Sequence, residues 1–244
     1  MASENVTDRE TDQTLGQLAY DRIRSDILKG HFEPGSPLRL QALKDRYGFS
    51  FSPLREALNR LQSEQLVVSY AARGFRVTEI SLEEMWDAID TRILIDCEAF
   101  RRSIRQGDDD WEARVMGSFH ALSRAFERNM ELGDAVTEDQ VSQLEDRHRA
   151  YHGALVSASG SNWMRVFSTQ LYNQTQRYRW PYFTTQGGNV FLKKSYLAEH
   201  REIAETAVAR KEEEAVALMA KGFRRTGEII EELLKGGGTL GRNP

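Results

Sequence analysis

The chain of 244 residues has little of what secreted, disulfide-bonded or membrane proteins depend on. Cys97 is its single cysteine, so an intrachain disulfide is excluded and a reducing compartment is favoured. No apolar run approaches the ~20 residues that a membrane-spanning helix needs, and residues 1–13 are polar and acidic, unlike a signal peptide. We therefore expect a cytoplasmic protein without a membrane segment, in which Cys97 packs inside an apolar helix.

The sequence also lacks the common motifs of enzymes. It contains neither a glycine-rich phosphate loop nor a Gly-x-Ser-x-Gly elbow. His148 and His152 have the spacing of a zinc-protease helix, but Arg149 stands where that mechanism needs a general-base glutamate. We predict that the protein is not an enzyme; a six-helix metal-binding protein with hydrolase or oxidase activity is the alternative.

Residues 52–58, which read SPLREAL, have the pattern of a helix with one buried face. We expect Ser52 to cap this helix and Pro53 to take its first position, where a missing N–H costs nothing. Apolar residues at positions 54, 57, 58 and 61 predict the buried face, which leaves Arg55 and Asn59 directed outwards. Arginine and asparagine suit contacts with base edges and phosphates, although any amphipathic surface helix shows the same alternation.

The flanking segments favour a winged helix-turn-helix. A helical pattern starts upstream at Leu15, and a second short helix fits residues 41–47, with Gly48 as the expected residue after its end. Downstream, the β-rich residues 66–68 and 75–77 predict a hairpin with glycine at its tip. Two helices, a turn, a third helix and a two-stranded wing are the elements of that DNA-binding fold.

Charge is distributed unevenly along the chain. Residues 14–78 contain ten Lys or Arg and six Asp or Glu, whereas residues 79–244 contain 22 and 27, and the whole chain has a net charge of −4. A small basic module on an acidic carrier suits a protein that neutralises DNA phosphates, although surface solubilisation alone gives a similar imbalance. The candidate phosphate or minor-groove contacts are Arg22, Arg24, Arg39, Lys44, Arg46, Arg73 and Arg76.

Residues 15–78 resemble the DNA-binding domain of the GntR family of bacterial transcription regulators. The resemblance rests on Pro34, Gly35, Leu38, Leu40, residues 52–58, Leu61, Leu66, Val67 and residues 73–77. The family usually has an arginine at the position of Phe51, so its operator sequence does not carry over, and Arg55 bears more of the recognition. The residues that we expect at the DNA are Arg39, Phe51, Ser52, Arg55, Asn59, Arg73, Gly74 and Arg76.

From position 80 onwards the pattern is helical, so the fold class is mainly α. Capping boxes, Ser81 with Glu84 and Thr137 with Gln140, open two of six predicted helices. The helices are expected at about 81–106, 110–130, 137–158, 162–180, 190–210 and 212–234, with Pro181 and Gly187–Gly188 as breaks. The predicted organisation is a flexible arm (1–13), the winged helix-turn-helix domain (14–79), a helical effector-binding and dimerisation domain (80–234) and a disordered tail (235–244).

The helical half resembles the FCD (FadR C-terminal domain) effector-binding domain that one branch of the GntR family carries. The residues behind this resemblance are Arg92, Asp96, His152, Ala154, Leu155, Asn162, Glu199, His200, Ile203 and Ala215. Residues 171–179, together with 53–55, further resemble the CsiR-type branch, whose members sense short dicarboxylates. In the family the position of Arg92 faces the ligand cavity, which implies a small organic acid as effector; an internal salt bridge to Asp96 is the alternative role.

Three histidines carry the predicted metal chemistry. His148 and His152 lie four residues apart on one helix face, and His200 on a later helix can complete a facial set. The FCD pattern implies four ligands, an aspartate at position 148 and a last histidine at Gly222, so one ligand is exchanged and one is lost. Three neutral imidazoles can still hold Zn or Ni with open positions; alternatively, they bind an anionic effector directly or are core groups. The expected effector-binding residues are Arg92, His148, His152, Arg177 and His200.

Together these patterns predict a ligand-responsive transcription regulator, a repressor rather than an activator, that binds double-stranded DNA. One winged helix contacts too few bases for specificity, so we expect a homodimer that reads a palindromic operator. A small organic acid bound among the helices, with or without a metal ion, is expected to change operator affinity by roughly 1 to 3 kcal/mol.

Overall fold

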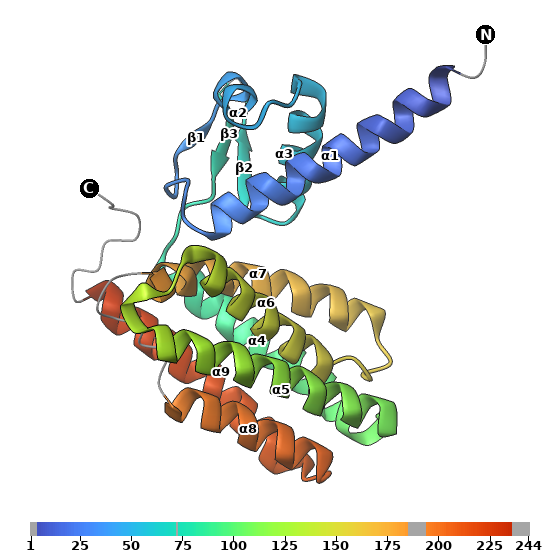
Figure 1. Ribbon diagram of the computed structural model, residues 1–244, viewed down its shortest axis with the longest axis vertical. Coiled ribbons are helices and arrows are strands. Elements are labelled where there is room, and N and C mark those ends of the chain that lie inside the picture. Colours follow the sequence, from blue (N-terminus) through green and yellow to red (C-terminus); the bar gives the residue numbers. More distant parts are fainter. Residues whose placement is uncertain (1–3, 72, 185–193, 236–244) are drawn as a thin grey trace. The chain divides into compact units, whose positions relative to one another are not determined.

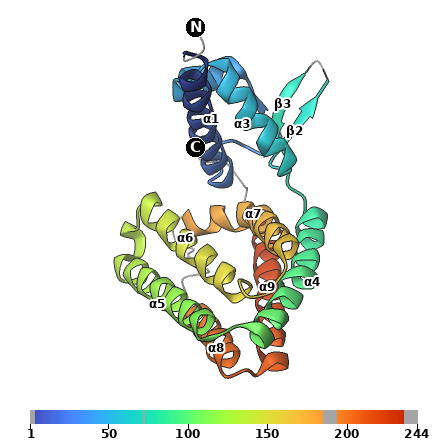
Figure 2. The same cartoon turned by 90° about the vertical axis from the view of Figure 1, so that its right-hand side faces the viewer.

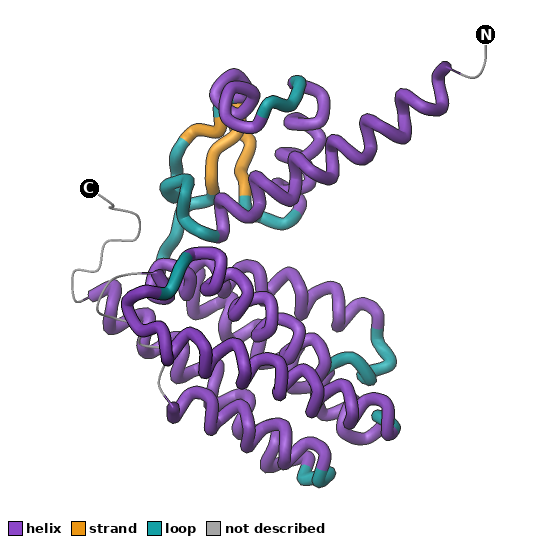
Figure 3. Tube along the Cα trace, viewed as in Figure 1, coloured by secondary structure: helices purple, strands orange, loops and turns teal. Residues whose placement is uncertain are grey.

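The computed structural model describes residues 4–71, 73–184 and 194–235 (Figure 1). The contacts within the chain divide it into two compact units, with the division between Ser81 and Leu82. The first unit combines helices with a small sheet, and within its described residues the second contains helices joined by short loops, as the colouring of Figure 3 shows. This organisation confirms the predicted class, a mainly α protein with a winged helix-turn-helix and a helical bundle.

The first unit is built on three helices and three short strands. They are α1 (Glu4–Leu28), β1 (Pro37–Leu38), α2 (Leu40–Tyr47), α3 (Phe51–Ser63), β2 (Val67–Tyr70) and β3 (Gly74–Val77). Helix α1 packs along α3, and Gly16 faces the end of the Glu56 side chain across this contact. The shared core contains Ala19, Ile23, Ile27, Leu43, Leu54, Ala57, Leu58, Leu61, Leu66 and Val77. Because α3 buries one face in this core, its opposite face is presented to solvent.

The strands form an antiparallel sheet in the order β1-β3-β2, with Pro37 opposite Arg76 and Val67 opposite Val77. Strands β2 and β3 stand out from the helices as a hairpin, visible in Figure 2. Gly74, at the start of β3, has a φ of +76°, a conformation that glycine adopts without strain. This hairpin is the predicted wing.

The second unit contains six helices and one short 3₁₀ turn within its described residues. They are α4 (Leu82–Gln106), α5 (Asp109–Leu132), the turn Gly133–Ala135, α6 (Glu138–Leu155), α7 (Asn162–Thr184), α8 (Lys194–Val208) and α9 (Glu212–Lys235). The packing contacts close a ring, in which α4 touches α7 and α9, α5 touches α6 and α8, α6 touches α7, and α8 touches α9 (Figure 2). None of the described helices is long and apolar enough to cross a membrane.

Local sequence signals predicted the end of α2 and the start of α6 correctly. Gly48 ends α2 in the left-handed conformation, with a φ of +77°. The capping box of Thr137 and Gln140 is present at the start of α6, where each side chain accepts a hydrogen bond from the backbone N–H of the other residue.

The start of α3 and the start of α1 differ from the predictions. Ser50, not Ser52, is the residue that precedes α3, so Ser52 and Pro53 lie within the first turn. Pro53 is tolerated there because the first-turn N–H groups have no partner within the helix. Helix α1 begins at Glu4, so residues 4–13 are helical where we predicted a flexible arm; no glycine or proline interrupts them.

The predicted break at Pro181 is wrong, because α7 continues to Thr184. A proline removes one backbone donor, and this helix tolerates the loss because residues 172, 173 and 175–180 are buried and hold it in the bundle. The break at Gly187–Gly188, the predicted start of a helix at 190 and nearly all of the tail at 235–244 lie outside the described residues.

Candidate functional site

The outward face of α3 carries the side chains that we predicted at the DNA. Phe51, Ser52, Arg55 and Asn59 are exposed. The side chains of Arg55 and Asn59 make no hydrogen bond, ion pair or ring contact with the described part of the chain. Helix α2 adds a cation beside this face, since the Lys44 ammonium lies 5.3 Å from the centre of the Phe51 ring. A guanidinium and an amide without internal partners are therefore available to a ligand such as DNA.

Some of the predicted DNA-contacting cations around α3 are exposed, and others are held by contacts within the chain. Arg39 and Arg73 are exposed, as is Gly74 in the wing. Arg76 is half-buried and donates from Nη1 to the carbonyl oxygen of Gly35 at 2.9 Å, so it joins the wing to the chain before β1. Of the other phosphate candidates, Arg46 pairs with Asp26 at 2.6 Å, Arg24 pairs with Glu64 at 3.7 Å, and Arg22 lies over the ring of Phe49.

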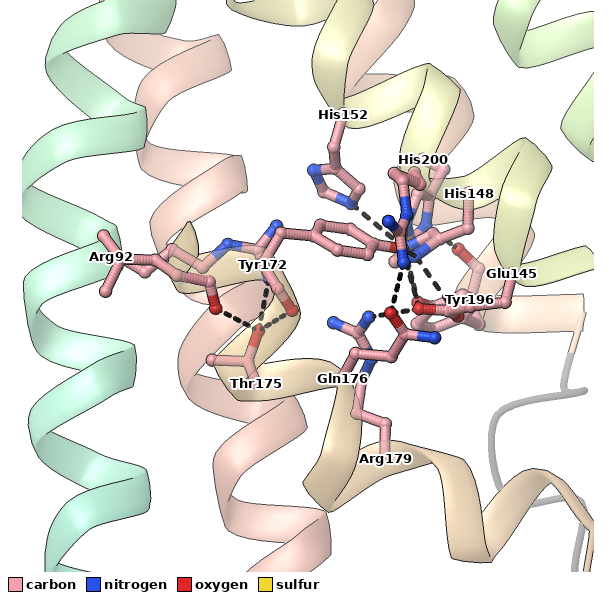
Figure 4. Close-up of polar contacts among 12 residues, drawn as sticks. Arg92, Glu145, His148, His152, Tyr172, Thr175, Gln176, Arg179, Tyr196 and His200 are labelled. Carbon is pink, nitrogen blue, oxygen red and sulfur yellow. Dashed lines mark hydrogen bonds and ion pairs between the residues drawn. The ribbon is translucent and has the colours of Figure 1, made fainter. Parts of the chain in front are cut away.

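The second unit brings the three predicted histidines together in the interior of the helix ring. The Nε2 atom of His148 lies 3.0 Å from that of His152 and 3.2 Å from that of His200. All three residues are less than 10% exposed, and Figure 4 shows the rings directed towards one another. Ligands at 2.0–2.1 Å from a metal ion lie roughly 2.8 to 3.4 Å apart for bond angles between 90° and tetrahedral. The two spacings from Nε2 of His148 therefore fit a metal site, and the ligand atoms of all three histidines lie within 4.8 Å of one another.

Hydrogen bonds behind the rings direct the Nε2 lone pairs to the centre. Nδ1 of His200 donates to the backbone oxygen of Tyr196 at 2.8 Å. The Tyr172 hydroxyl donates to Glu145 at 2.8 Å, so its oxygen accepts from Nδ1 of His148 at 2.7 Å. Each of these two rings then has no proton on Nε2 while it is neutral. Metal-binding histidines are usually oriented in this way by a carbonyl or carboxylate.

The charges around the cluster keep it neutral. Burial, followed by the fields of neighbouring cations, lowers the pKa of His148 and of His152 well below the usual histidine value. Burial lowers the pKa of His200 to about 4. Burial and the nearby Glu145 hold the pKa of Tyr172 well above its usual value, so the phenol keeps the proton that it donates. Neutral imidazole is the form that binds a metal ion.

Removing one of these orienting groups should weaken metal binding. We expect Tyr172→Phe to lower the affinity for Zn²⁺ by about 10- to 100-fold, because Nδ1 of His148 loses its acceptor. Competition with a chromophoric chelator measures this affinity directly. Tyr178→Phe, on the same helix, is the matched control and should bind Zn²⁺ as the wild type does. Equal affinities for Tyr172→Phe and the wild type would show that the hydroxyl does not orient a ligand.

The depressed histidine pKa values also predict how stability depends on pH. The pKa of His200 is about 4 in the folded chain and near its ordinary 6.5 after unfolding, so below pH 6.5 the unfolded chain binds more protons. Metal-free protein should therefore lose stability as the pH falls from 6.5 towards 4, by roughly 3 kcal/mol from this residue. His200→Gln should show a shallower fall in melting temperature over that window. Parallel curves for the two proteins would contradict the assignment.

A pocket within the ring connects the histidines to Arg92. Its lining residues are Met85, Ile89, Arg92, His148, His152, Thr175, Tyr178, Arg179, Ser195, Tyr196, Glu199, His200, Ile203, Met219, Gly222, Phe223, Arg225, Thr226, Ile229 and Ile230. Arg92 donates from Nε to Asp96 at 2.8 Å and from Nη1 to Thr175 at 3.0 Å. Its Nη2 is buried with no hydrogen-bond partner among the described residues. Arg92 is thus paired with Asp96 and also lines the pocket.

One predicted effector residue lies elsewhere, and several pocket groups were not predicted. Arg177 does not line the pocket; its Nη2 lies 3.3 Å from the carboxylate of Glu84. Arg179, two residues further along α7, lines it instead and pairs with the buried Glu145 at 2.6 Å. Tyr196 places its hydroxyl 2.9 Å from Nε2 of His148. The pairing of Glu145 and Arg179 joins α6 to α7, so a pattern within one helix could not have shown it.

These two units define the class of the protein, a helix-turn-helix transcription regulator whose helical unit encloses a pocket. The model of the bacterial regulatory proteins of the gntR family matches residues 15–77, and that of the FCD domain matches residues 87–225. The chain belongs to the GntR family and carries an FCD domain. It is a transcription regulator and not an enzyme, which removes the hydrolase or oxidase alternative.

Relatives match over most of the chain. The uncharacterized HTH-type transcriptional regulator BphR of Paraburkholderia xenovorans (strain LB400) is 39% identical over 90% of this chain and 86% of its own. The HTH-type transcriptional repressor GlaR of Escherichia coli (strain K12) is 30% identical over 89% of this chain and 96% of its own. Among solved structures, E. coli McbR/YncC has the same fold, with a TM-score of 0.74 at 17% identity, and covers 90% of this chain and 98% of that one.

Proposed function

We propose that this regulator acts in the cytoplasm as a homodimeric repressor that reads a palindromic operator and responds to a small organic acid. The observation that carries the proposal is the pair of exposed, unpartnered side chains, Arg55 and Asn59, on α3. Base edges in a major groove present acceptors that such donors match. Repression is supported by the printed description of GlaR as a repressor.

Two copies are needed because one α3 helix presents few base contacts. A twofold axis would place two α3 helices about one helical turn of DNA apart, on the two halves of a palindrome. The proposed DNA contacts are Arg39, Phe51, Ser52, Arg55, Asn59, Arg73 and Gly74, with Arg76 in a smaller part because it is tied to Gly35.

An anionic effector is supported by the donors in the pocket wall. Arg92 has a buried Nη2 and Arg179 a buried Nε, and neither atom has a hydrogen-bond partner among the described residues. Unpartnered buried donors on charged groups are costly, so an incoming carboxylate that accepts from them would be bound strongly. We propose that Arg92, Arg179 and the histidines form the effector site, and the resemblance to the CsiR-type branch makes short dicarboxylates the first acids to test.

The donor set of His148, His152 and His200 fits a divalent metal ion, and we propose Zn²⁺ or Ni²⁺. When bound, such an ion supplies open coordination positions for an acid. The residues themselves provide three Nε2 lone pairs, and the hydrogen bonds to Tyr172 and the Tyr196 carbonyl hold two of the rings in place.

Position 222, where the FCD pattern has its last histidine, has glycine in this chain. A histidine restored there should change metal affinity and effector affinity in opposite directions. A Cβ on Gly222 would meet no atom within 4 Å, and the residue lines the pocket. We expect Gly222→His to raise Zn²⁺ affinity at least about tenfold and to weaken acid binding, because a fourth protein ligand occupies an open position. Calorimetry with Zn²⁺ and then with acid measures both, with Gly222→Ala as the control for bulk. Unchanged Zn²⁺ affinity would show that position 222 does not reach the site.

The proposed function is tested by a mobility shift with DNA from upstream of the regulator's own coding sequence. The full-length protein should retard this fragment in preference to random duplex of equal length. A thermal-shift screen of C3 to C6 mono- and dicarboxylates should then identify acids that change the shift. If no promoter fragment is preferred over random duplex, the repressor proposal fails.

A further inference from the structure

The pocket has two chemically different ends. The end with Arg92 holds polar groups, since Thr175 bonds to Arg92 and the histidines lie nearby (Figure 4). Phe223 on α9 lies at the same end of the pocket. The centre of its ring is 4.2 Å from the guanidinium of Arg92 and 5.6 Å from the centre of the His152 ring. The hydrogen-bond donors that can bind the carboxylate of an acid therefore lie at this end of the pocket.

From Arg92 the pocket extends along α4 towards the start of that helix. Ile89 and Met85 follow Arg92 on the pocket face, which spans roughly 10 Å of helix. Helix α9 runs beside this stretch, since a Cβ on Gly227 would meet the side chain of Ile89. Its lining residues there are Ile229 and Ile230. The wall at this end is therefore mostly aliphatic, and its polar group is the Tyr178 hydroxyl, which donates to Glu84 at 3.4 Å.

Among the described residues that line the pocket, each arginine already has a carboxylate partner. Arg92 pairs with Asp96 and Arg179 with Glu145, both at the polar end. Arg225 pairs with Glu199, next to His200 in sequence. The Thr226 hydroxyl donates to the carbonyl oxygen of Gly222 at 2.9 Å. A second carboxylate that reached Met85 and Ile230 would lose its water and, among the described residues that line the pocket, would find no arginine without a carboxylate partner to compensate.

We propose that the effector is a monocarboxylic acid with an unbranched apolar chain, bound with its carboxylate at Arg92 and its chain between Met85, Ile89, Ile229 and Ile230. The inference rests on the proposed effector site and narrows its ligand class. It differs from what the CsiR-type resemblance implies, because a dicarboxylate long enough to reach Met85 and Ile230 would need donors at that end of the pocket as well.

Titration calorimetry on the full-length protein with one equivalent of Zn²⁺ tests separately the effect of the ligand's apolar chain and the effect of a second carboxylate on the ligand. Hexanoate should bind about fourfold more tightly for each methylene that it has beyond butanoate. Hexanedioate has the same carbon chain as hexanoate with a second carboxylate, and it should bind at least about tenfold more weakly. Equal affinities for butanoate and hexanoate, or a preference for hexanedioate, would overturn the inference.

A positive charge placed at the apolar end of the pocket should reverse the preference for hexanoate over hexanedioate. Ile229 is only half-buried, so Ile229→Arg should fold, which a melting curve verifies. This variant should bind hexanedioate more tightly than hexanoate. Leu94→Arg is the matched control, since Leu94 is 72% exposed and does not line the pocket. It should keep the preference of the wild type, and an unreversed preference in folded Ile229→Arg would also contradict the inference.

The same titrations, repeated as operator mobility shifts, distinguish this inference from the proposed function. If hexanedioate is preferred and changes operator affinity, the proposed function stands and the inference fails. If hexanoate is preferred but leaves operator affinity unchanged, the inference stands and the proposed coupling fails. If neither acid binds, the inference fails, and the proposed function then depends on whether another C3 to C6 acid changes the operator shift.

Discussion

Arg55→Ala should weaken specific operator binding by at least about 30-fold. A well-formed contact between an arginine and a base contributes about 1 to 3 kcal/mol, and a homodimer loses two of them. Because the Arg55 side chain is exposed and makes no contact with the described part of the chain, its removal should change stability by less than about 0.5 kcal/mol. Footprinting on the upstream DNA measures the first effect, and a melting curve measures the second.

Loss of charge alone must be separated from loss of a base contact. Arg128→Ala removes the same charge from an exposed position on α5 in the second unit, and it should leave the footprint unchanged. Arg55→Ala should also bind random duplex almost as the wild type does, because phosphate contacts dominate non-specific affinity. A footprint for Arg55→Ala that matches the wild type would remove α3 from base recognition.

Replacing the buried ion pair in the pocket should abolish most of the effector response. Arg92→Ala alone would leave Asp96 buried and unpaired, which destabilises proteins by about 3–5 kcal/mol. The double variant Arg92→Gln with Asp96→Asn removes both charges and keeps a polar side chain at each position. We expect its acid affinity to fall about 10- to 100-fold, because the charge-assisted hydrogen bonds to the carboxylate are lost. Calorimetry measures the acid affinity, and operator binding without acid should be unchanged.

Helix α4 offers a matched control for this experiment. Arg102 pairs with Glu98 at 2.8 Å, four residues away on the same helix, and this pair does not line the pocket. Arg102→Gln with Glu98→Gln should therefore titrate acid as the wild type does. If the Arg92 and Asp96 variant also titrates like the wild type while remaining folded, Arg92 does not bind the acid.

The sequence allowed a good prediction of the first unit because its signals are local. The spacing of Leu54, Leu58 and Leu61 identified the buried face of α3, and these residues are fully buried in the structure. The exact start of the helix was missed because Ser50 and Ser52 are both suitable caps, and side-chain preference alone does not choose between them.

The pocket was predicted only in part because its groups come from several helices. The histidines were found by their spacing on α6 and by the family pattern. The sequence led us to Arg177 and not to Arg179. Residues 175–180 of α7 are all buried, so no apolar stripe in the sequence distinguishes an inward face of this helix. Charged residues usually lie at the surface, yet Glu145 is 3% exposed because Tyr172 and Arg179 satisfy its carboxylate.

The central claim is that one chain couples a pocket in its helical unit to DNA binding by its winged helix. Coupling between two binding sites is reciprocal, so the factor by which acid changes operator affinity must equal the factor by which operator changes acid affinity. The decisive measurement is acid affinity by calorimetry with and without saturating operator, beside operator affinity by fluorescence anisotropy with and without saturating acid. We predict the same factor in both, about 5- to 150-fold. Acid that binds in the pocket and leaves operator affinity unchanged would contradict the account.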